Sequence, residues 1–135
     1  MNSPWDAEIE ISEELVRRLL DEQFPEFAAC SLSLLGEGWD NAAWLVGDDW
    51  VFRFPRRQLG ADVILSEFAV VPAVADRLTA PVSCPLRIGK PTSEYSWPFA
   101  GYPLIPGVEL CQAAPPASQR LKLAEELGLF LRSLH

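Results

Sequence analysis

The sequence predicts an α+β domain in which a five-stranded antiparallel sheet packs against helices. β-prone runs bounded by turn residues predict the strands, at 31–38, 42–46, 50–54, 86–88 and 102–105. Apolar residues at helical spacing predict the helices, at 12–24, at 62–78 and from Ser118 to the last residue. A chain of 135 residues, 49% of them hydrophobic, has the apolar surface for one core, and two are not expected.

The first predicted helix has a clear beginning and end. Ser12 is a good N-cap, and Glu13 and Glu14 follow it in the first turn, where the helix dipole favours negative charge. The apolar face is formed by Leu15, Val16, Leu19 and Leu20. We expect the helix to stop before Pro25, because a residue that precedes proline is pushed out of the helical region.

The middle of the chain predicts three consecutive antiparallel strands. Gly47, Asp48 and Asp49 lie between the β-prone runs AAWLV and WVFRF, which is typical of a hairpin turn. The run SLSLLGEG precedes them and supplies the first strand of the three.

The predicted helix over 62–78 contains a proline. Its apolar positions recur at spacings of three and four, at Ile64, Phe68, Val71, Ala75 and Leu78. Pro72 removes one backbone hydrogen bond and clashes with the preceding turn, so we expect a kink or a break into two short helices.

The last part of the chain predicts two strands and a helix. The strands are separated by KPTSEYSWPFAG, whose Pro, Ser and Gly content indicates a loop. The final helix has an apolar face formed by Leu121, Ala124, Leu127, Leu131 and Leu134. Because it reaches the last residue without a C-cap signal, we expect the natural protein to continue.

Charge and cysteine content restrict the function classes. The net charge of −8 argues against binding to nucleic acid, and it fits either a cationic ligand or an ordinary acidic surface. Cys30, Cys84 and Cys111 have irregular spacing, so neither a zinc site nor a disulfide framework is expected, only reduced and mostly buried thiols. No uncharged apolar run approaches the ~20 residues of a membrane span, so we expect a soluble, cytoplasmic protein without a membrane partner.

A glycine-rich turn joins the first two strands. Gly36 and Gly38 would let the backbone approach a ligand closely, and its free N–H groups could bind phosphate oxygens. Glycine hairpins are also common without a ligand. The turn lacks the third glycine of a dinucleotide fingerprint and the Gly-Lys-Ser/Thr of a P-loop, whereas a hairpin over phosphates is the protein-kinase arrangement.

The kinase arrangement requires a cation on the third strand and a carboxylate on the next helix. Arg53 is a charge among apolar residues in WVFRFP, and Glu67 lies between apolar neighbours in the predicted helix. The alternatives are an edge-strand arginine that faces solvent and a solvated helix acid.

Together these residues resemble the amino-terminal lobe of the aminoglycoside phosphotransferase and choline kinase superfamily, which shares the protein-kinase fold. Within this superfamily, the sequence motifs are most similar to those of aminoglycoside 2''-phosphotransferases. The resemblance extends from about Ser31 and is carried by GEGWDNAAWLVGDDWVFRFP, Glu67, the Pro-rich passage before Ile88, GYPLIPG and LGLFLRSLH.

The resemblance implies roles for the turn and the charged pair. Gly36, Gly38 and Asn41 would form the loop over the nucleotide phosphates, Arg53 would clamp the phosphates, and Glu67 would orient Arg53. Kinases usually have lysine at the position of Arg53, and a planar guanidinium pairs with different geometry from a point charge.

The resemblance also implies contacts with the purine. The base would be covered by three apolar residues, Leu35, Ala43 and Val51, whose alternative role is plain sheet core. The segment 102–107 resembles the hinge between lobes, where the Pro103 C=O and the Ile105 N–H would bind the purine edge. A rigid Pro-rich turn is the alternative for that segment.

The same resemblance divides the chain into a nucleotide-binding lobe, 1–107, and a linker with a helix, 108–135, that leads to a second lobe. The HGD-type loop and the Mg²⁺ ligands of the family are absent from the sequence, so these residues alone are expected to be inactive. The full-length parent would use ATP or GTP with Mg²⁺ to phosphorylate a hydroxyl of an aminoglycoside-like substrate.

The sequence alone does not distinguish several other substrates and functions. The substrate could be choline, a macrolide, homoserine or a sugar. The chain could also be a non-catalytic kinase-like binding module, or an α+β domain with no nucleotide site. With the second lobe absent, the last helix should expose an apolar patch, and the isolated lobe could dimerise through it.

Overall fold

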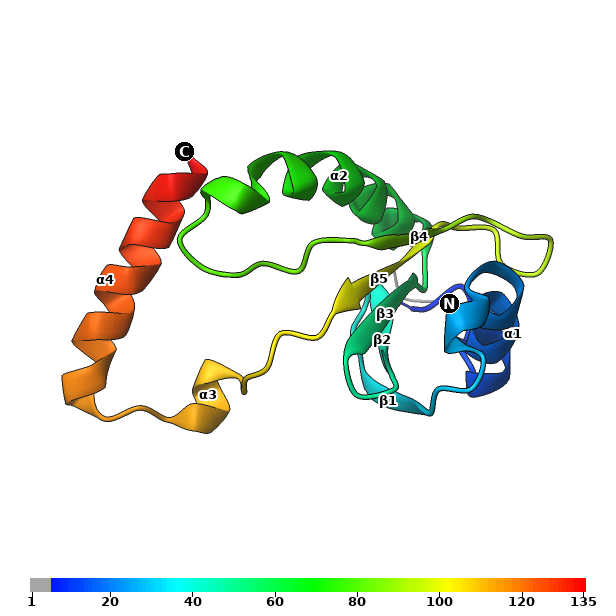
Figure 1. The fold of residues 1–135 in the computed structure, drawn as a ribbon, viewed down its shortest axis with the longest axis horizontal. Coiled ribbons are helices and arrows are strands. Elements are labelled where there is room, and N and C mark those ends of the chain that lie inside the picture. The colour runs from blue at the N-terminus through cyan, green and yellow to red at the C-terminus, as the bar shows by residue number, and fades with distance from the viewer. Residues whose placement is uncertain (1–5) are drawn as a thin grey trace.

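The computed structural model describes residues 6–135, and its centre is a five-stranded antiparallel sheet with strand order β1-β2-β3-β5-β4 (Figure 1). The strands are β1 (Leu32–Glu37), β2 (Asn41–Val46), β3 (Trp50–Pro55), β4 (Arg87–Gly89) and β5 (Phe99–Pro103). The predicted α+β class and the five-stranded antiparallel sheet are therefore confirmed. Within the predicted lobe 1–107, the first five residues lie outside the described part of the chain.

The last two strands begin and end at different residues from those predicted. β4 is shifted by one residue, and β5 begins at Phe99 and not at Tyr102. Phe99 is fully buried and stacks on Phe54 with 4.9 Å between ring centroids, so aromatic packing draws the end of the predicted loop into the sheet. The prediction of a strand over 102–105 was wrong for Leu104 and Ile105, which follow the end of β5.

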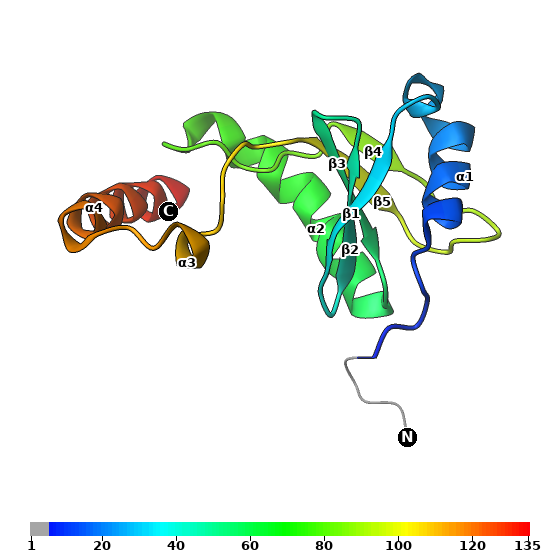
Figure 2. The same ribbon diagram turned by 90° about the horizontal axis from the view of Figure 1, so that it is seen from below.

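One face of the sheet is covered by α1 (Glu13–Gln23). The helix begins as predicted, since the Ser12 hydroxyl oxygen accepts a hydrogen bond from the Leu15 N–H at 3.3 Å. Its apolar face packs into the main core, which includes Trp44, Phe52 and Phe54 from the sheet. Figure 2 shows α1 and α2 on opposite sides of the strands, so the domain has three layers.

The other face of the sheet is covered by α2 (Gln58–Val74), which begins earlier and ends earlier than predicted. The helix continues through Pro72 and passes into a short 3-10 helix, Ala75–Arg77. We expected a kink or a break at Pro72; the helix is not broken there, and the change to a 3-10 helix comes three residues later. Ile64 of α2 is fully buried and packs in a second cluster with Ala100 and Tyr102.

By length and composition alone, residues 58–77 could cross a membrane, with a mean hydropathy of 1.4. A helix packed on a sheet in a soluble protein passes the same test. Ile64 is buried against the sheet and Glu67 forms an ion pair with Arg53, as expected of a helix that covers a sheet.

The end of the chain leaves the sheet. After β5 it forms the short helix α3 (Leu110–Ala113) and then α4 (Ala117–Leu134), which lies away from the strands (Figure 1). The final helix was predicted one residue later, from Ser118. No residue of α4 is buried, and its leucines are exposed, with Leu121 at 74% and Leu127 at 58%.

The cysteines are reduced, but the expectation of mostly buried thiols was wrong. Cys30 and Cys84 are partly buried, and Cys111 is exposed. The first two lie in loops that precede β1 and β4, and Cys111 lies in α3 outside the core. A position in peripheral segments therefore outweighs the usual tendency of free cysteine to be buried.

Candidate functional site

Arg53 on β3 and Glu67 on α2 meet on the α2 side of the sheet. The Arg53 Nη2 donates to Glu67 Oε2 at 2.5 Å, and the two side chains are only 30% and 16% exposed. Register explains the position of Arg53, because its strand neighbours Phe52 and Phe54 are fully buried on the α1 side. The solvent-facing arginine and the solvated acid are thereby excluded.

Two of the predicted purine contacts share this face of the sheet. Ala43 is the β2 partner of Arg53, and Val51 lies two residues before Arg53 on the same strand. Both are partly buried. Residues two apart on a strand point to the same side, so Ala43, Val51 and Arg53 form one surface.

Leu35 lies in a β-bulge at the start of the glycine turn. Leu34 is opposite Trp44 and Gly36 is opposite Ala43, which leaves Leu35 as the extra residue. A bulge changes which residues face each side. Leu35 is consequently half exposed and is not part of the buried core, so its alternative role as plain sheet core does not apply.

The space over the glycine turn is open. A Cβ added at Gly36 would meet nothing within 4 Å, and one at Gly38 would meet only the Asn41 carbonyl oxygen, at 3.8 Å. Neither glycine has a positive φ. Packing and backbone conformation therefore do not require glycine here, whereas close approach of a ligand to the backbone would.

The segment 102–107, for which the sequence predicts a hinge, begins at the end of β5. The Gly101 carbonyl accepts from Leu86 N–H on the β4 side, so the Pro103 carbonyl, two residues on, points to the same side. The Leu104 N–H instead donates to the Asp49 carbonyl at 2.7 Å, toward β3. Within residues 6–135, the Ile105 N–H donates to no backbone acceptor.

Tyr102 contributes to the site in a way that the sequence did not reveal. It pairs with Val51 across β3 and β5, and the Arg53 Cζ lies 5.0 Å from the centroid of its ring. Burial raises the pKa of the Tyr102 phenol, an effect that the Arg53 charge opposes, so the hydroxyl is a neutral donor at pH 7. The only sequence signal was its position at the start of GYPLIPG.

Three polar atoms in this region lack hydrogen-bond partners among the described residues. They are Asn41 Oδ1, Arg53 Nε and the Tyr102 hydroxyl. All three residues belong to strand positions on the α2 side of the sheet. A buried polar atom without a partner is costly, so hydrogen-bonding capacity is left unused on this face of the sheet.

A second group of charges holds the turn itself and was also missed. Arg57 Nε donates to Asp40 Oδ1 at 2.5 Å, and Arg56 Nη1 donates to the Gly38 carbonyl at 2.9 Å. Arg56 Nη2 also lies 3.5 Å from Glu37 Oε2. Two consecutive arginines directly after β3 were the sequence feature that could have indicated these contacts.

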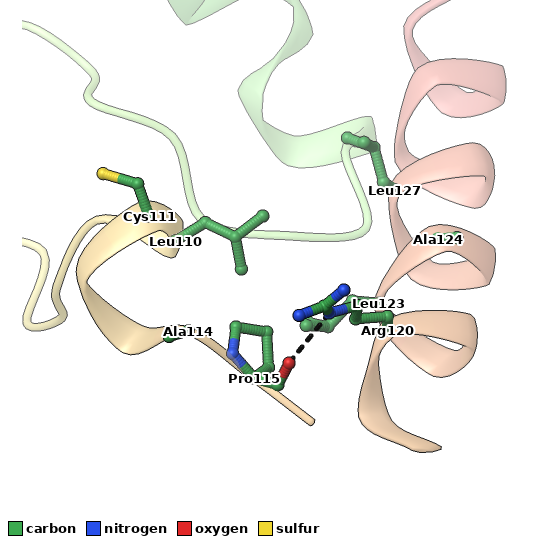
Figure 3. Close-up of a pocket in the computed structure, with 8 residues that line it drawn as sticks. All are labelled: Leu110, Cys111, Ala114, Pro115, Arg120, Leu123, Ala124 and Leu127. Atoms are coloured by element: carbon green, nitrogen blue, oxygen red, sulfur yellow. Dashed lines mark hydrogen bonds between the residues drawn. The ribbon is translucent and has the colours of Figure 1, made fainter. Parts of the chain in front are cut away.

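The described residues form no metal-binding group, and an apolar pocket lies apart from Arg53 and Glu67. In the described part of the chain, no three His, Cys, Asp or Glu side chains are grouped to hold a metal ion. An apolar pocket lies between α3 and α4 (Figure 3), away from Arg53, and is lined by residues such as Leu110, Cys111 and Leu127. Arg120 is the positively charged residue among those that line the pocket in Figure 3, and its Nε donates to the Pro115 carbonyl at 2.9 Å.

The sheet order, the helix that brings Glu67 to Arg53 and the glycine turn define the amino-terminal lobe of a protein with a kinase-like fold. Residues 31–135 match the model of the phosphotransferase enzyme family, APH, and the chain belongs to this family. No curated protein sequence matches the chain.

Solved structures of aminoglycoside phosphotransferases are similar to the chain. The GDP complex of wild-type aminoglycoside 2'-phosphotransferase-IIIa has 32% identity and a TM-score of 0.83, over 91% of this chain and 42% of that one. The GDP and kanamycin complex of APH(2")-IIIa has 34% identity and a TM-score of 0.78, over 86% of this chain and 39% of that one. The gentamicin complex of APH(2")-IIa has 18% identity and a TM-score of 0.70, over 94% of this chain and 40% of that one. At this identity the similarity supports the fold alone. The chain spans well under half the length of these proteins.

Proposed function

We propose that this chain is the nucleotide-binding lobe of a small-molecule phosphotransferase that uses ATP or GTP. The observation that carries the proposal is the Arg53–Glu67 pair beneath an open glycine turn, with the Arg53 side chain still 30% exposed. A guanidinium held by a carboxylate keeps N–H groups for phosphate oxygens, which are its preferred partners. Gly36 and Gly38 would lie over the phosphates, and Asn41 would contribute its side-chain amide.

The purine would lie between the sheet and a second lobe. Leu35, Ala43 and Val51 would cover one face of the base. The Pro103 carbonyl would accept from the purine edge, and the Ile105 N–H would donate to it. These contacts fix the base, so that the triphosphate extends toward Arg53.

The reaction would transfer the γ-phosphoryl group from the nucleotide to a hydroxyl oxygen of the acceptor. In such transfers the protein mainly positions the groups and neutralises charge. Mg²⁺ would supply charge neutralisation between the phosphates, and its ligands and the base for the hydroxyl proton would come from a second lobe. Residues 1–107 would thus bind nucleotide, and 108–135 would link the lobes.

We further propose that the acceptor is an aminoglycoside-like molecule. Solved structures that are 32–34% identical to the chain include complexes with GDP and kanamycin, which favours an aminoglycoside-like acceptor. The net charge of −8 suits a polycationic acceptor and does not suit nucleic acid. We also propose that the protein works in the cytoplasm, where nucleoside triphosphates are available, without a membrane partner.

Nucleotide titration tests the proposal. Calorimetry of the 135-residue chain with GTP and ATP should give saturable binding of at least one, and Arg53→Ala should weaken it roughly 10- to 100-fold, as expected for a lost charged hydrogen bond. Arg77→Ala is the control, because Arg77 is exposed at the far end of α2. Absent binding, or equal binding by Arg53→Ala, would contradict the proposal.

A phosphoryl-transfer assay tests whether the 135 residues bind nucleotide without catalysing the reaction. The 135 residues should bind nucleotide but should not phosphorylate kanamycin. Phosphorylation of kanamycin by these residues alone would show that the hydroxyl base lies within them and would refute this part of the proposal.

A further inference from the structure

The glycine turn is tied to the beginning of α2 by contacts that lie outside the predicted nucleotide contacts. We infer that Asp40, Arg57 and Gly60 form a clamp that sets the position of the turn over the nucleotide phosphates. The three are positioning residues, since none of them needs to touch the nucleotide. The inference rests on the proposed function and adds to it the means by which the turn is held.

The first part of the clamp is an ion pair. Arg57 Nε and Nη2 each lie 2.5 Å from Asp40 Oδ1. The Arg57 side chain is 14% exposed and that of Asp40 is 39% exposed, so water screens the pair from the Asp40 side only. Arg57 is the residue directly before α2, so the pair joins the end of the turn to the beginning of the helix.

The second part is a close backbone approach. A Cβ added at Gly60 would lie 2.4 Å from the Asp40 carbonyl oxygen and 3.2 Å from its carbonyl carbon. The same oxygen accepts from the Arg56 N–H at 2.8 Å, so it is held in place and cannot yield easily. Glycine at position 60 therefore allows α2 to pack directly on the turn.

Arg56 extends the contact along the turn. Its Nη1 donates to the Gly38 carbonyl at 2.9 Å, and the Gly38 N–H donates to the Asn41 carbonyl at 2.9 Å. The peptide groups on both sides of Gly38 are therefore held by groups within the lobe. The turn is thus fixed even though the space above it is open.

The arrangement links the two phosphate contacts of the proposed site. The first turn of α2 holds the glycine turn through Asp40, and the same helix holds Arg53 through Glu67. A single helix therefore sets the distance between the turn and the guanidinium. Loss of the clamp should disturb binding of the phosphates and leave binding of the base unchanged.

The test uses two variants and matched controls in the 135-residue chain. Gly60→Ala removes the close approach, and Gly128→Ala is its control, because a Cβ at Gly128 meets nothing within 4 Å. Asp40→Asn removes the charge of the ion pair, and Asp21→Asn, at an exposed position of α1, is its control.

Two measurements are made on each variant. Hydrogen exchange of the amides of 36–41, without ligand, should be about 10-fold faster in Gly60→Ala and Asp40→Asn than in the controls. The Kd for GDP should rise about 10-fold, as for one lost charged hydrogen bond, while the Kd for guanosine changes by less than about 2-fold. A general loss of stability would weaken both ligands alike.

The outcomes separate the clamp from the proposed function. Unchanged exchange at 36–41 overturns the clamp, whatever the nucleotide does. Faster exchange with unchanged GDP binding, or equal weakening for GDP and guanosine, overturns its role in phosphate positioning. If the unaltered chain binds neither GTP nor ATP, the proposed function fails, and exchange alone still decides whether the clamp orders the turn.

Discussion

The guanidinium of Arg53 lies over the ring of Tyr102, with Cζ 5.0 Å from the ring centroid, while it donates to Glu67. Arg53 is thus held by an aromatic face as well as by a carboxylate, and Tyr102 lies near the end of β5, where the predicted hinge begins. Tyr102 therefore lies between the proposed phosphate contact, Arg53, and the proposed purine contact, Pro103. Substitution of Tyr102 should separate the contribution of the ring from that of the hydroxyl.

Tyr102→Leu removes the ring and Tyr102→Phe removes only the hydroxyl. A cation–π contact contributes about 0.5–2 kcal/mol, so the leucine variant should lose about that much stability and should bind nucleotide more weakly. The phenylalanine variant keeps the ring over Arg53 and loses only the hydroxyl, which faces the Glu67 carboxylate, so it should lose less stability than the leucine variant. Urea unfolding of both variants measures this, and equal losses would show that the ring does not hold Arg53.

Alkaline pH should destabilise the fold. Burial raises the pKa of both Tyr95 and Tyr102 in the folded state above about 10, the value in an unfolded chain. A raised pKa means that the stability is fully present below pH ~10 and is lost as the pH rises beyond it, because the unfolded chain then releases protons that the folded chain keeps. Each phenol should contribute a slope of up to about 1.4 kcal/mol per pH unit.

The chain contains 2 tyrosines, so Tyr95→Phe with Tyr102→Phe removes every phenol. Urea unfolding between pH 8 and pH 11 should show a shallower loss of stability in the double variant. Tyr95→Phe alone should also cost about 1–3 kcal/mol at neutral pH, because the Tyr95 hydroxyl donates to the Pro55 carbonyl at 2.6 Å in the core. Identical pH slopes would mean that burial does not control these phenols.

Local signals predicted much of the fold and part of the site. Ser12 and its acidic neighbours indicated a helix start because capping depends on adjacent residues, and Gly47 indicated a hairpin for the same reason. The meeting of Arg53 and Glu67 was predictable because strand alternation and helical spacing fix the faces of both elements.

The remaining features depend on packing between distant segments. β5 begins at Phe99 because its ring stacks on Phe54, and no neighbour of Phe99 in the sequence carries that information. The contact of Gly60 with the Asp40 carbonyl likewise depends on where α2 lies against the turn. The roles of the site residues toward a nucleotide stay predictions.

Two glycine substitutions should have opposite effects on stability. A Cβ at Gly101 would lie 2.5 Å from Cζ of Phe52, a fully buried ring packed against Phe24 and Phe27, so Gly101→Ala should cost about 1–3 kcal/mol. Gly128 lies within α4 in open space, and Gly128→Ala should raise the helix stability by about 0.5–1 kcal/mol. Thermal unfolding followed by near-UV circular dichroism measures the first change. A stable Gly101→Ala would mean that the aromatic core can shift.

The exposed leucines of α4 should make this chain associate with itself. Leu121 and Leu127 of α4 are 74% and 58% exposed, and large contiguous apolar patches on a soluble chain favour association. Light scattering over a wide concentration range should give a mass that rises with concentration. Leu121→Gln with Leu127→Gln should restore the mass of a monomer, whereas Leu59→Gln, an equally apolar change at an exposed position of α2, should not. A constant monomer mass for the unaltered chain would show that these leucines do not bind a second copy.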